Sequence, residues 1–285
     1  MSDIPSLDVE HLQSWIGREE SASDIISLDL VGKFNAMLDQ AAGPPVWGKA
    51  APLLINYCLA QPAAPTGQLG DDGHPRLGGF LPPVPLPRRM WAGSSLAFHG
   101  DLKVGDLVRR VSRIADIAVK EGRSGVLCFV TVEHKVEVAG SLKIKETQNI
   151  VYREGASPKD AVKPAATEVA PAGTHIRPIA VSTPLLFRYS ALTFNAHRIH
   201  YDRAYVTEVE YYPGLVVQSP LQATLLLNFA AELKGKAPSR FTFRSLSPLF
   251  DDDKISLHAA EADGKIELWT AREHGPVATS AEAVW

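Results

Sequence analysis

The sequence predicts an α+β protein in which a helical segment followed by a run of antiparallel strands occurs twice. Three observations lead to this prediction: helical periodicity near the start of each half, long Val- and Ile-rich stretches separated by short turns, and a polar linker between the halves. The chain has 285 residues, of which 45% are hydrophobic, which is enough to bury one large core or two of medium size.

The first 40 residues are predicted to be helical. Apolar side chains recur at helical spacing in two sets, one over 7–16 and one over 26–38, and Asp24 stands before the second set as a candidate N-cap. Residues 46–60 are apolar enough to form a buried helix, with Pro52 at a kink or in its first turn.

A long loop and three strands are predicted to complete the first half. Glycine and proline recur throughout residues 61–89, and the apolar side chains of this loop favour packing over disorder. Three stretches rich in Val and Ile follow, at 107–119, 125–138 and 142–152. The short runs between them, 122–125 and 139–140, are typical of hairpin turns.

The second half is predicted to repeat this order after a linker. A helix is expected at about 218–234. Four strands are expected after it, at about 239–249, 254–262, 264–273 and 276–285. A helix wrapped by a long antiparallel sheet is the hot-dog arrangement, so two such units in tandem predict a double hot-dog.

This repeat sets the predicted domain boundaries. Residues 1–153 form the first hot-dog unit with a helical N-terminal extension, and 175–285 form the second unit. Residues 154–174 contain Gly, Ala, Ser, Pro, Lys and Thr with few large apolar side chains, which is typical of a linker.

The composition argues against several classes of function. The formal net charge is -3 and no long basic run is present, so nucleic acid is not an expected partner. The two cysteines, Cys58 and Cys128, have no spacing pattern typical of a disulfide framework or a zinc site. No apolar stretch approaches the roughly 18 residues that span a membrane, and no secretory signal is recognisable. We therefore expect a soluble cytoplasmic protein without membrane association.

Residues 193–202 are the strongest candidate for an active site. Asn195, His197 and His200 fall within six positions, just upstream of a Tyr-Pro-Gly turn that ends at Gly214. Histidine is suited to proton transfer because its reference pKa of about 6.5 lies close to working pH. The nearby start of the predicted helix at 218–234 offers free N–H groups and the positive end of the helix dipole, which suit an anionic oxygen.

This segment resembles the motif of the MaoC-like hydratases. The pattern Asn195-x-His197-x-x-His200-x-Asp202 is similar to the family motif Asp-x-Asn-Pro-x-His-x-Asp. The resemblance places His200 at the catalytic histidine and Asn195 at the position of the catalytic aspartate. Asn195 cannot act as a base, but it can hold the attacking water or orient the imidazole through hydrogen bonds.

Within this family the chain resembles the mesaconyl-C4-CoA hydratase group, which is related to the type 2 hydroxyacyl-thioester dehydratases. Three segments carry that resemblance, 78–93, 146–153 and 194–202, and it covers about residues 30–285. It implies reversible addition of water to a C5 branched dicarboxyl enoyl-CoA, namely mesaconyl-C4-CoA (3-methylfumaryl-CoA) or itaconyl-CoA, to give citramalyl-CoA. Coenzyme A enters only as part of this small-molecule substrate, and no metal or other cofactor is expected. A homodimer is compatible with the sequence.

The resemblance also implies roles for particular residues. His200 is expected to be the base, and the Ser219 N–H, with the nearby Gly214, is expected to meet the thioester oxygen. A guanidinium is suited to the substrate carboxylate or to CoA, and the candidates are Arg88, Arg89 and Arg198. His197 and Asp202 are expected to play supporting roles, with Asp202 paired to Arg198 at i, i+4.

Three other functions remain open. The first is a 3-hydroxyacyl-thioester dehydratase of fatty acid metabolism, which keeps the chemistry but changes the acyl group. The second is a non-catalytic acyl-CoA-binding subunit, which the asparagine at position 195 motivates. The third is a hot-dog thioesterase, which ranks low because no Asp or Glu stands at a convincing position in the motif. For the loop residues Asp71, Asp72 and His74, a solvated turn is favoured over a metal site.

Overall fold

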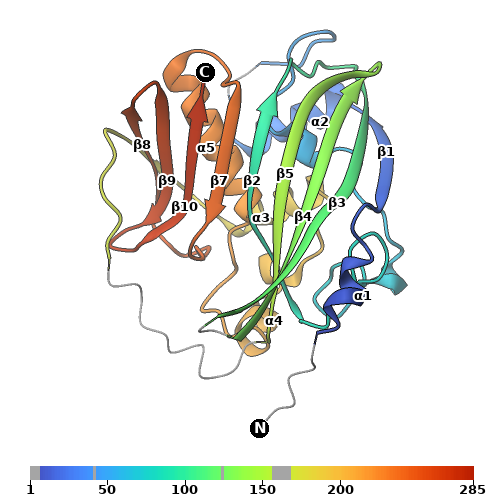
Figure 1. Ribbon diagram of the computed structural model, residues 1–285. Coiled ribbons are helices and arrows are strands. Elements are labelled where there is room, and N and C mark those ends of the chain that lie inside the picture. The colour runs from blue at the N-terminus through green and yellow to red at the C-terminus, as the bar shows by residue number, and fades with distance from the viewer. Residues whose placement is uncertain (1–6, 41–42, 123–124, 156–167) are drawn as a thin grey trace.

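One continuous antiparallel sheet organises the molecule. The computed structural model describes residues 7–40, 43–122, 125–155 and 168–285. Its ten strands run in the order β1-β3-β4-β5-β2-β7-β10-β9-β8-β6, so strands of the first half occupy one side and strands of the second half the other (Figure 1). The double hot-dog prediction is confirmed by this arrangement together with the similar solved structures described below.

The three strands predicted for the first half lie close to their predicted positions, as β3 (Leu107–Gly122), β4 (Gly125–Val138) and β5 (Ser141–Arg153). Two further strands precede them, β1 (Glu19–Ile25) and β2 (Arg88–Phe98). The alternation of buried and exposed residues in β4 and β5 is that of a sheet with one face on a core. The predicted turn at Ala139-Gly140 is present, while residues 123–124 of the other predicted turn and residues 156–167 of the predicted linker lie outside the described residues.

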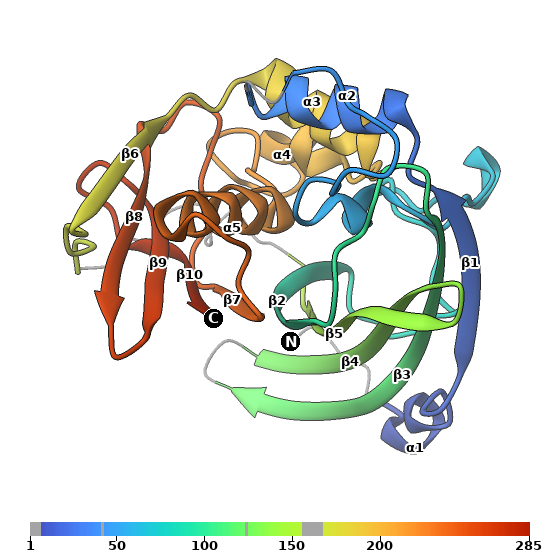
Figure 2. The ribbon, with the colours of Figure 1, turned by 90° about the horizontal axis from the view of Figure 1, so that it is seen from above.

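The second half follows the predicted order of helix and strands. Its strands are β6 (His175–Ile179), β7 (Arg240–Ser245), β8 (Ile255–Ala262), β9 (Lys265–Arg272) and β10 (Val277–Val284). Helix α5 (Ser219–Lys234) lies along the concave side of these strands (Figure 2). Its buried side chains include Leu221, Leu226 and Phe229, which belong to a core cluster shared with both halves. Burial of this apolar surface is the main force that holds helix and sheet together.

The two halves join where β2 pairs with β7. The register runs from Gly93 opposite Arg244 to Ala97 opposite Arg240. A β-bulge lies in β2 at this point, and a Cβ added at Gly93 would overlap the Phe243 carbonyl oxygen. Glycine therefore permits the close approach of the two strands that makes the sheet continuous.

The N-terminal prediction is right about two helices and wrong about what lies between them. Helices α1 (Val9–Gln13) and α2 (Leu28–Met37) flank β1, which pairs along its length with β3. Ser27, not Asp24, caps α2 by accepting a hydrogen bond from the Leu30 N–H. Asp24 instead accepts one from the Ala60 N–H at 3.1 Å. Pairing at the sheet edge outweighs local helix propensity here.

The predicted buried helix at 46–60 is also wrong. Only a short 3₁₀ helix forms, η1 (Ile55–Cys58), and the preceding residues lie alongside the 102–104 segment. Ala51 donates to Leu102 O at 2.8 Å and Gly48 to Val104 O at 2.9 Å. Pro52 has no N–H for a longer helix, so tertiary pairing satisfies this backbone instead.

Three short helical elements complete the part of the second half that carries the candidate site. Helix α3 (Thr183–Leu192) lies beside α2, and the 3₁₀ helix η4 (Arg198–His200) leads into α4 (Arg203–Glu208) (Figure 2). In the long loop of the first half the structure has only the 3₁₀ helix η2 (Thr66–Gln68) among its described residues. None of the helices that the structure describes has the length and apolarity needed to cross a membrane.

Candidate active site

A cavity of about 900 Å³ is lined by residues of both halves. The second half contributes residues from the predicted motif and from the start of α5. The first half contributes residues from the long loop and from the concave faces of β2 to β5. The side chains used below that line it are His74, Arg89, Arg110, His134, Glu146, Asn195, His197, His200 and Ser219.

His200 is a neutral imidazole held in one orientation. Its ring is buried at the end of η4, and its Nδ1 lies 2.7 Å from the Val216 carbonyl oxygen. Since a carbonyl only accepts, Nδ1 carries the proton and Nε2 keeps a lone pair. Burial lowers the pKa of His200 to about 4, although the bond to Val216 acts in the opposite direction. The imidazole is therefore unprotonated near neutral pH.

Asn195 shapes the turn that carries the histidines. Its side-chain oxygen accepts a hydrogen bond from the His197 N–H at 3.0 Å, which is the Asx arrangement common in turns. Its side chain also lines the cavity. The amide is positioned to donate a hydrogen bond to a ligand, but it supplies no negative charge to the site.

The start of α5 presents an open N–H group to the cavity. Gln218 precedes the helix and makes no side-chain capping bond, and within the described part of the chain the Ser219 N–H has no acceptor. The Ser219 hydroxyl accepts a hydrogen bond from Ser245 at 2.8 Å. An uncapped helix N-terminus of this kind stabilises negative charge.

Gly214 does not lie where the thioester was expected. It is buried against Asp251 and is absent from the cavity lining. Asp251 accepts a hydrogen bond from the adjacent Leu215 N–H at 2.9 Å. The expectation that Gly214 contacts the substrate is therefore not met, because this turn faces Asp251 and its neighbours in the loop between β7 and β8.

Two of the three candidate arginines are already paired. Arg88 is buried, with its Nε 2.5 Å from a Glu210 carboxylate oxygen, and it does not line the cavity. Arg198 donates twice to Asp202, at 3.0 and 2.8 Å, and its guanidinium lies over the Tyr205 ring. Neither guanidinium is placed to bind a substrate carboxylate, so this part of the expectation is not met for Arg88 and Arg198.

Arg89 differs from both, because its side chain lines the cavity. Among the residues that the structure describes, no carboxylate lies within salt-bridge distance of its guanidinium, although the Tyr152 hydroxyl and the Asp72 carboxylate are near enough for its charge to lower their pKa values. Its charge contributes to the lowered pKa of His74 and of His197, so it lies beside these rings. It is the one of the three predicted arginines whose geometry fits an anionic ligand.

Asp202 and His197 are the two residues for which supporting roles were predicted, and the predicted pairing of Asp202 with Arg198 is present. Asp202 pairs with Arg198 at i, i+4 and also caps α4 by accepting from the Tyr205 N–H at 3.0 Å. The His197 ring lies between two other imidazoles, with centroids 5.4 Å from His200 and 4.1 Å from His74. Burial, followed by the charges of its neighbours, lowers the pKa of His197 well below its usual range.

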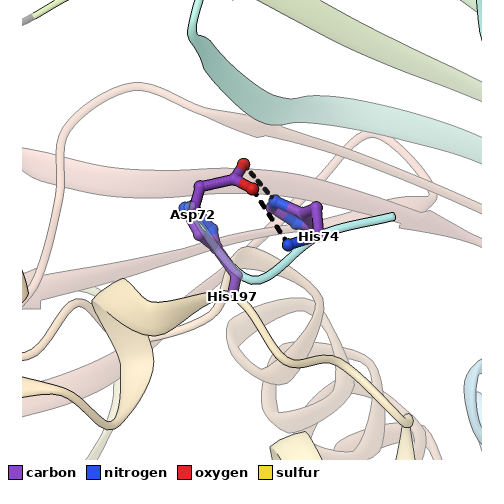
Figure 3. Close-up of side chains that lie close together, drawn as sticks. All are labelled: Asp72, His74 and His197. Carbon is purple, nitrogen blue, oxygen red and sulfur yellow. Dashed lines mark hydrogen bonds and ion pairs between the residues drawn. The ribbon is translucent and has the colours of Figure 1, made fainter. Parts of the chain in front are cut away.

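The partner of His197 comes from the first half and was not predicted. His74 and Asp72 lie on the long loop, with His74 Nδ1 2.8 Å from Asp72 Oδ2 (Figure 3). The His74 backbone N–H also donates to Asp72 Oδ1 at 2.9 Å. The signal in the sequence was the run Asp71-Asp72-Gly73-His74, but nothing in it shows that the loop reaches a motif more than a hundred positions away.

Asp72, His74 and His197 are near enough to one another to hold a metal ion, since their ligand atoms lie within 4.8 Å. However, both oxygens of Asp72 are engaged with His74. The arrangement is that of a carboxylate orienting an imidazole, which leaves only the two histidines with unused nitrogen atoms. A hydrogen-bonded pair describes the geometry better than a ligand set.

The wall of the cavity in the first half is polar, which the sequence also did not reveal. Glu146 is buried and accepts a hydrogen bond from the Tyr57 hydroxyl at 3.0 Å, and burial raises its pKa to about 7. His134 contacts Ser112 and Gln148, and burial lowers its pKa to about 4. Arg110 lies near Glu146 on the same face. A long aliphatic chain gains little from such a surface.

The fold and this site define a double hot-dog protein of the hydratase and dehydratase class. A MaoC-like dehydratase from Phytophthora capsici has a similar structure, with a TM-score of 0.72 over 98% of both chains at 13% identity. A Mycobacterium tuberculosis protein described as having a double hot-dog fold is similar with a TM-score of 0.54, over 94% of this chain and 96% of the other, at 14% identity.

Residues 55–251 match the family model of hydroxyacyl-thioester dehydratase type 2, and the chain belongs to this family. It is 44% identical over 269 residues to a mesaconyl-C(4)-CoA hydratase of Chloroflexus aurantiacus, covering 94% of this chain and 95% of that protein. It is 28% identical over 239 residues to the mitochondrial hydroxyacyl-thioester dehydratase type 2 of Schizosaccharomyces pombe, covering 74% and 77%. The protein is thus a lyase of the hydratase type.

Proposed function

We propose that the protein adds water reversibly to mesaconyl-C4-CoA (3-methylfumaryl-CoA) to give citramalyl-CoA. The similarity to the Chloroflexus aurantiacus hydratase supports this substrate. The single observation that carries the chemistry is the neutral imidazole of His200 in a cavity that also contains the open Ser219 N–H. Hydration of a conjugated thioester needs an acceptor that holds the attacking water and a donor for the thioester oxygen, and these two groups supply them.

The reaction proceeds at two points of the cavity. His200 Nε2 accepts a hydrogen bond from the attacking water, and Asn195 holds this water through its amide. As the water oxygen bonds to the β-carbon, negative charge develops on the thioester oxygen. The Ser219 N–H and the positive end of α5 stabilise this charge in the transition state.

Arg89 accounts for the selectivity towards a dicarboxyl acyl group. In mesaconyl-C4-CoA the free carboxylate is attached to the β-carbon, so it must lie beside the histidines that hold the water. Arg89 lies beside His74 and His197, and no described carboxylate lies within salt-bridge distance of it. A guanidinium binds a carboxylate through two parallel hydrogen bonds, which also fixes the orientation of the alkene.

Rates on two substrates distinguish this proposal from a fatty acid dehydratase. We expect kcat/KM for mesaconyl-C4-CoA to exceed that for crotonyl-CoA, which lacks the carboxylate, by about 100-fold or more. Equal rates, or a preference for longer aliphatic enoyl-CoA esters, would contradict the proposed substrate.

The alternative that the protein is a non-catalytic acyl-CoA-binding subunit is tested with a substitution. His200→Ala is expected to lower kcat on mesaconyl-C4-CoA by about 100-fold or more, because it removes the imidazole that holds the attacking water. Turnover at background in both the wild type and this variant, on every enoyl-CoA tried, would favour a binding subunit instead.

Itaconyl-CoA is a second substrate if the enzyme first moves the double bond into conjugation. In deuterated water this route places one deuterium in the new methyl group and another on the α-carbon. An α-carbon without deuterium in the citramalyl-CoA formed would rule out isomerisation before hydration.

A further inference from the structure

The site contains an imidazole better suited to carry a transient positive charge than His200. His200 donates its Nδ1 proton to a neutral carbonyl, that of Val216. His74 has its Nδ1 2.8 Å from a carboxylate, that of Asp72 (Figure 3). A base that accepts the water proton becomes an imidazolium, and an adjacent carboxylate stabilises that form much more than a carbonyl does. Position 195, an asparagine where the MaoC-like motif has aspartate, supplies no such charge.

We propose that Asp72 and His74 form the general base of the hydration, with His200 and Asn195 holding the water, so that the first half of the chain supplies the carboxylate that position 195 lacks. The inference rests on the proposed function. In this scheme His74 is a catalytic residue and Asp72 is a positioning residue that fixes the tautomer of His74 and stabilises its charged form.

The loop that carries this pair is docked firmly on the motif of the second half. The Arg198 N–H donates to Asp72 O at 2.9 Å, and the Arg198 guanidinium donates to Asp71 O at the same distance. Gly73 packs on the Ala196 carbonyl so closely that a Cβ there would overlap it. The pair therefore has a fixed position relative to His197 and His200, as proton transfer requires.

The protonation states agree with this role. Burial acts to raise the pKa of Asp72, but the hydrogen bonds from His74, together with the charge of Arg89, outweigh it, so the pKa is lowered and the carboxylate is ionised. Burial and the charge of Arg89 lower the pKa of His74, while Asp72 acts against them. His74 is thus neutral before the reaction, with the Nδ1 proton directed at Asp72 and a lone pair on Nε2.

A single proton passes from the water to His74 and then to the α-carbon, so the proton count of the reaction balances. His74 Nε2 takes a proton from the water as the water oxygen forms its bond to the β-carbon, and the alkene electron pair moves towards the thioester. The resulting imidazolium then gives the same proton to the α-carbon, where the new C–H bond forms. His74 returns to its neutral state, and the dehydration direction follows the same steps in reverse.

Three variants test the proposal on the intact protein. Asp72→Asn keeps the shape and the acceptor for the His74 N–H but presents an amide to Nδ1, which favours the wrong tautomer. We expect kcat to fall by about 100-fold or more with KM changed by less than about threefold, and His74→Gln to have a similar effect. Asp71→Asn is the matched control, because the neighbouring side chain is exposed, and it should keep the wild-type rate.

Two further readouts separate catalysis from structure. Because Asp72 raises the pKa of His74, Asp72→Asn should move the acid limb of the kcat/KM profile to lower pH. Added imidazole should restore part of the activity of His74→Ala. A kcat for Asp72→Asn within about twofold of wild type would overturn the proposal. So would loss of wild-type activity on dialysis against EDTA with recovery on adding zinc, which would identify a metal site instead.

The same measurements distinguish failure of this inference from failure of the proposed function. If the wild type hydrates crotonyl-CoA but not mesaconyl-C4-CoA, the substrate is wrong and the variants are compared on crotonyl-CoA, where the same losses still support the base. If the wild type hydrates no enoyl-CoA, both proposals fall together.

Discussion

At the scale of single residues, three neutral imidazoles in a row define the site. His74, His197 and His200 have centroids 4.1 and 5.4 Å apart, and burial lowers the pKa of each. Neutral rings close together avoid mutual repulsion and keep lone pairs available near neutral pH. The charge that the substrate carboxylate needs is supplied next to them by Arg89.

Arg89 can be tested by removing its charge while keeping most of its length. Arg89→Met is expected to lower kcat/KM on mesaconyl-C4-CoA by about 100-fold and to leave the rate on crotonyl-CoA within about threefold, because only the first substrate has a carboxylate. Arg109→Met is the control, since Arg109 is exposed on the opposite face of the sheet and pairs with Glu137. A parallel loss on both substrates would show that Arg89 acts on the fold and not on the carboxylate.

The positions of single residues were predictable from sequence where the family motif specifies them. They were not predictable where a contact with a residue distant in sequence determines the position of the side chain. His200, Asn195 and Ser219 line one cavity, as the resemblance implied. Arg88 looked equivalent to Arg89 in sequence, yet alternation along β2 directs it to Glu210, which is 122 positions away. No local pattern reveals such a partner, and the same reason hid His74.

At the scale of elements, the docked loop is the part on which the site depends. Residues 70–74 close on themselves through the bond from the Gly70 N–H to His74 O at 2.8 Å, and Gly73 has a φ of +87° against the Ala196 carbonyl. An L-residue at this position meets both a strained backbone conformation and a steric overlap. The geometry of the loop is therefore set by one glycine.

Gly73→Ala should undock the loop without unfolding the sheet. We expect kcat/KM to fall by about tenfold to 100-fold, because a shift of about 1 Å in a reacting group has effects of this size. The melting temperature should change much less. Gly67→Ala in the same loop is the control, since a Cβ there meets no atom within 4 Å. Equal activity of the two variants would mean that the loop position does not matter for turnover.

Helices and strands were predictable where the pattern of their own residues specifies them, and not where pairing with a distant segment does. The strands β3 to β5 and helix α5 lie within a few residues of their predicted positions, because long alternating or periodic stretches specify them. Strand β1 was missed because its polar sequence, Glu19–Ile25, becomes a strand only by pairing with β3. The extended course of residues 46–54 is likewise set by bonds to the 102–104 segment.

At the scale of the whole molecule, buried neutral histidines link stability to pH. His134 and His200 each have a pKa of about 4 in the folded state, below the reference of about 6.5 in an unfolded chain. Between these values the unfolded chain binds more protons than the folded one. The stability that each ring contributes is therefore fully present above about pH 6.5 and is lost as the pH falls towards 4.

The free energy of unfolding should therefore decrease by about 2–3 kcal/mol per histidine between pH 7 and pH 4. Denaturant titrations at intervals of half a pH unit would measure this. His134→Gln should flatten the dependence, because it removes one of the buried titrating rings, whereas substitution of the exposed His175 should not. A stability that is constant across this range would show that the rings bind protons as readily in the folded state as in the unfolded chain.

Because the motif of the second half contacts residues 70–74 of the first, the two halves of different family members are not freely interchangeable. A chimaera that takes residues 175–285 from one relative and the first half from another brings together a motif and a loop that did not evolve against each other. Such hybrids are expected to fold through the β2–β7 junction and yet to lack turnover unless the loop travels with the motif. A chimaera that contains the motif of residues 193–202 without its matching loop is therefore expected to lack hydratase activity.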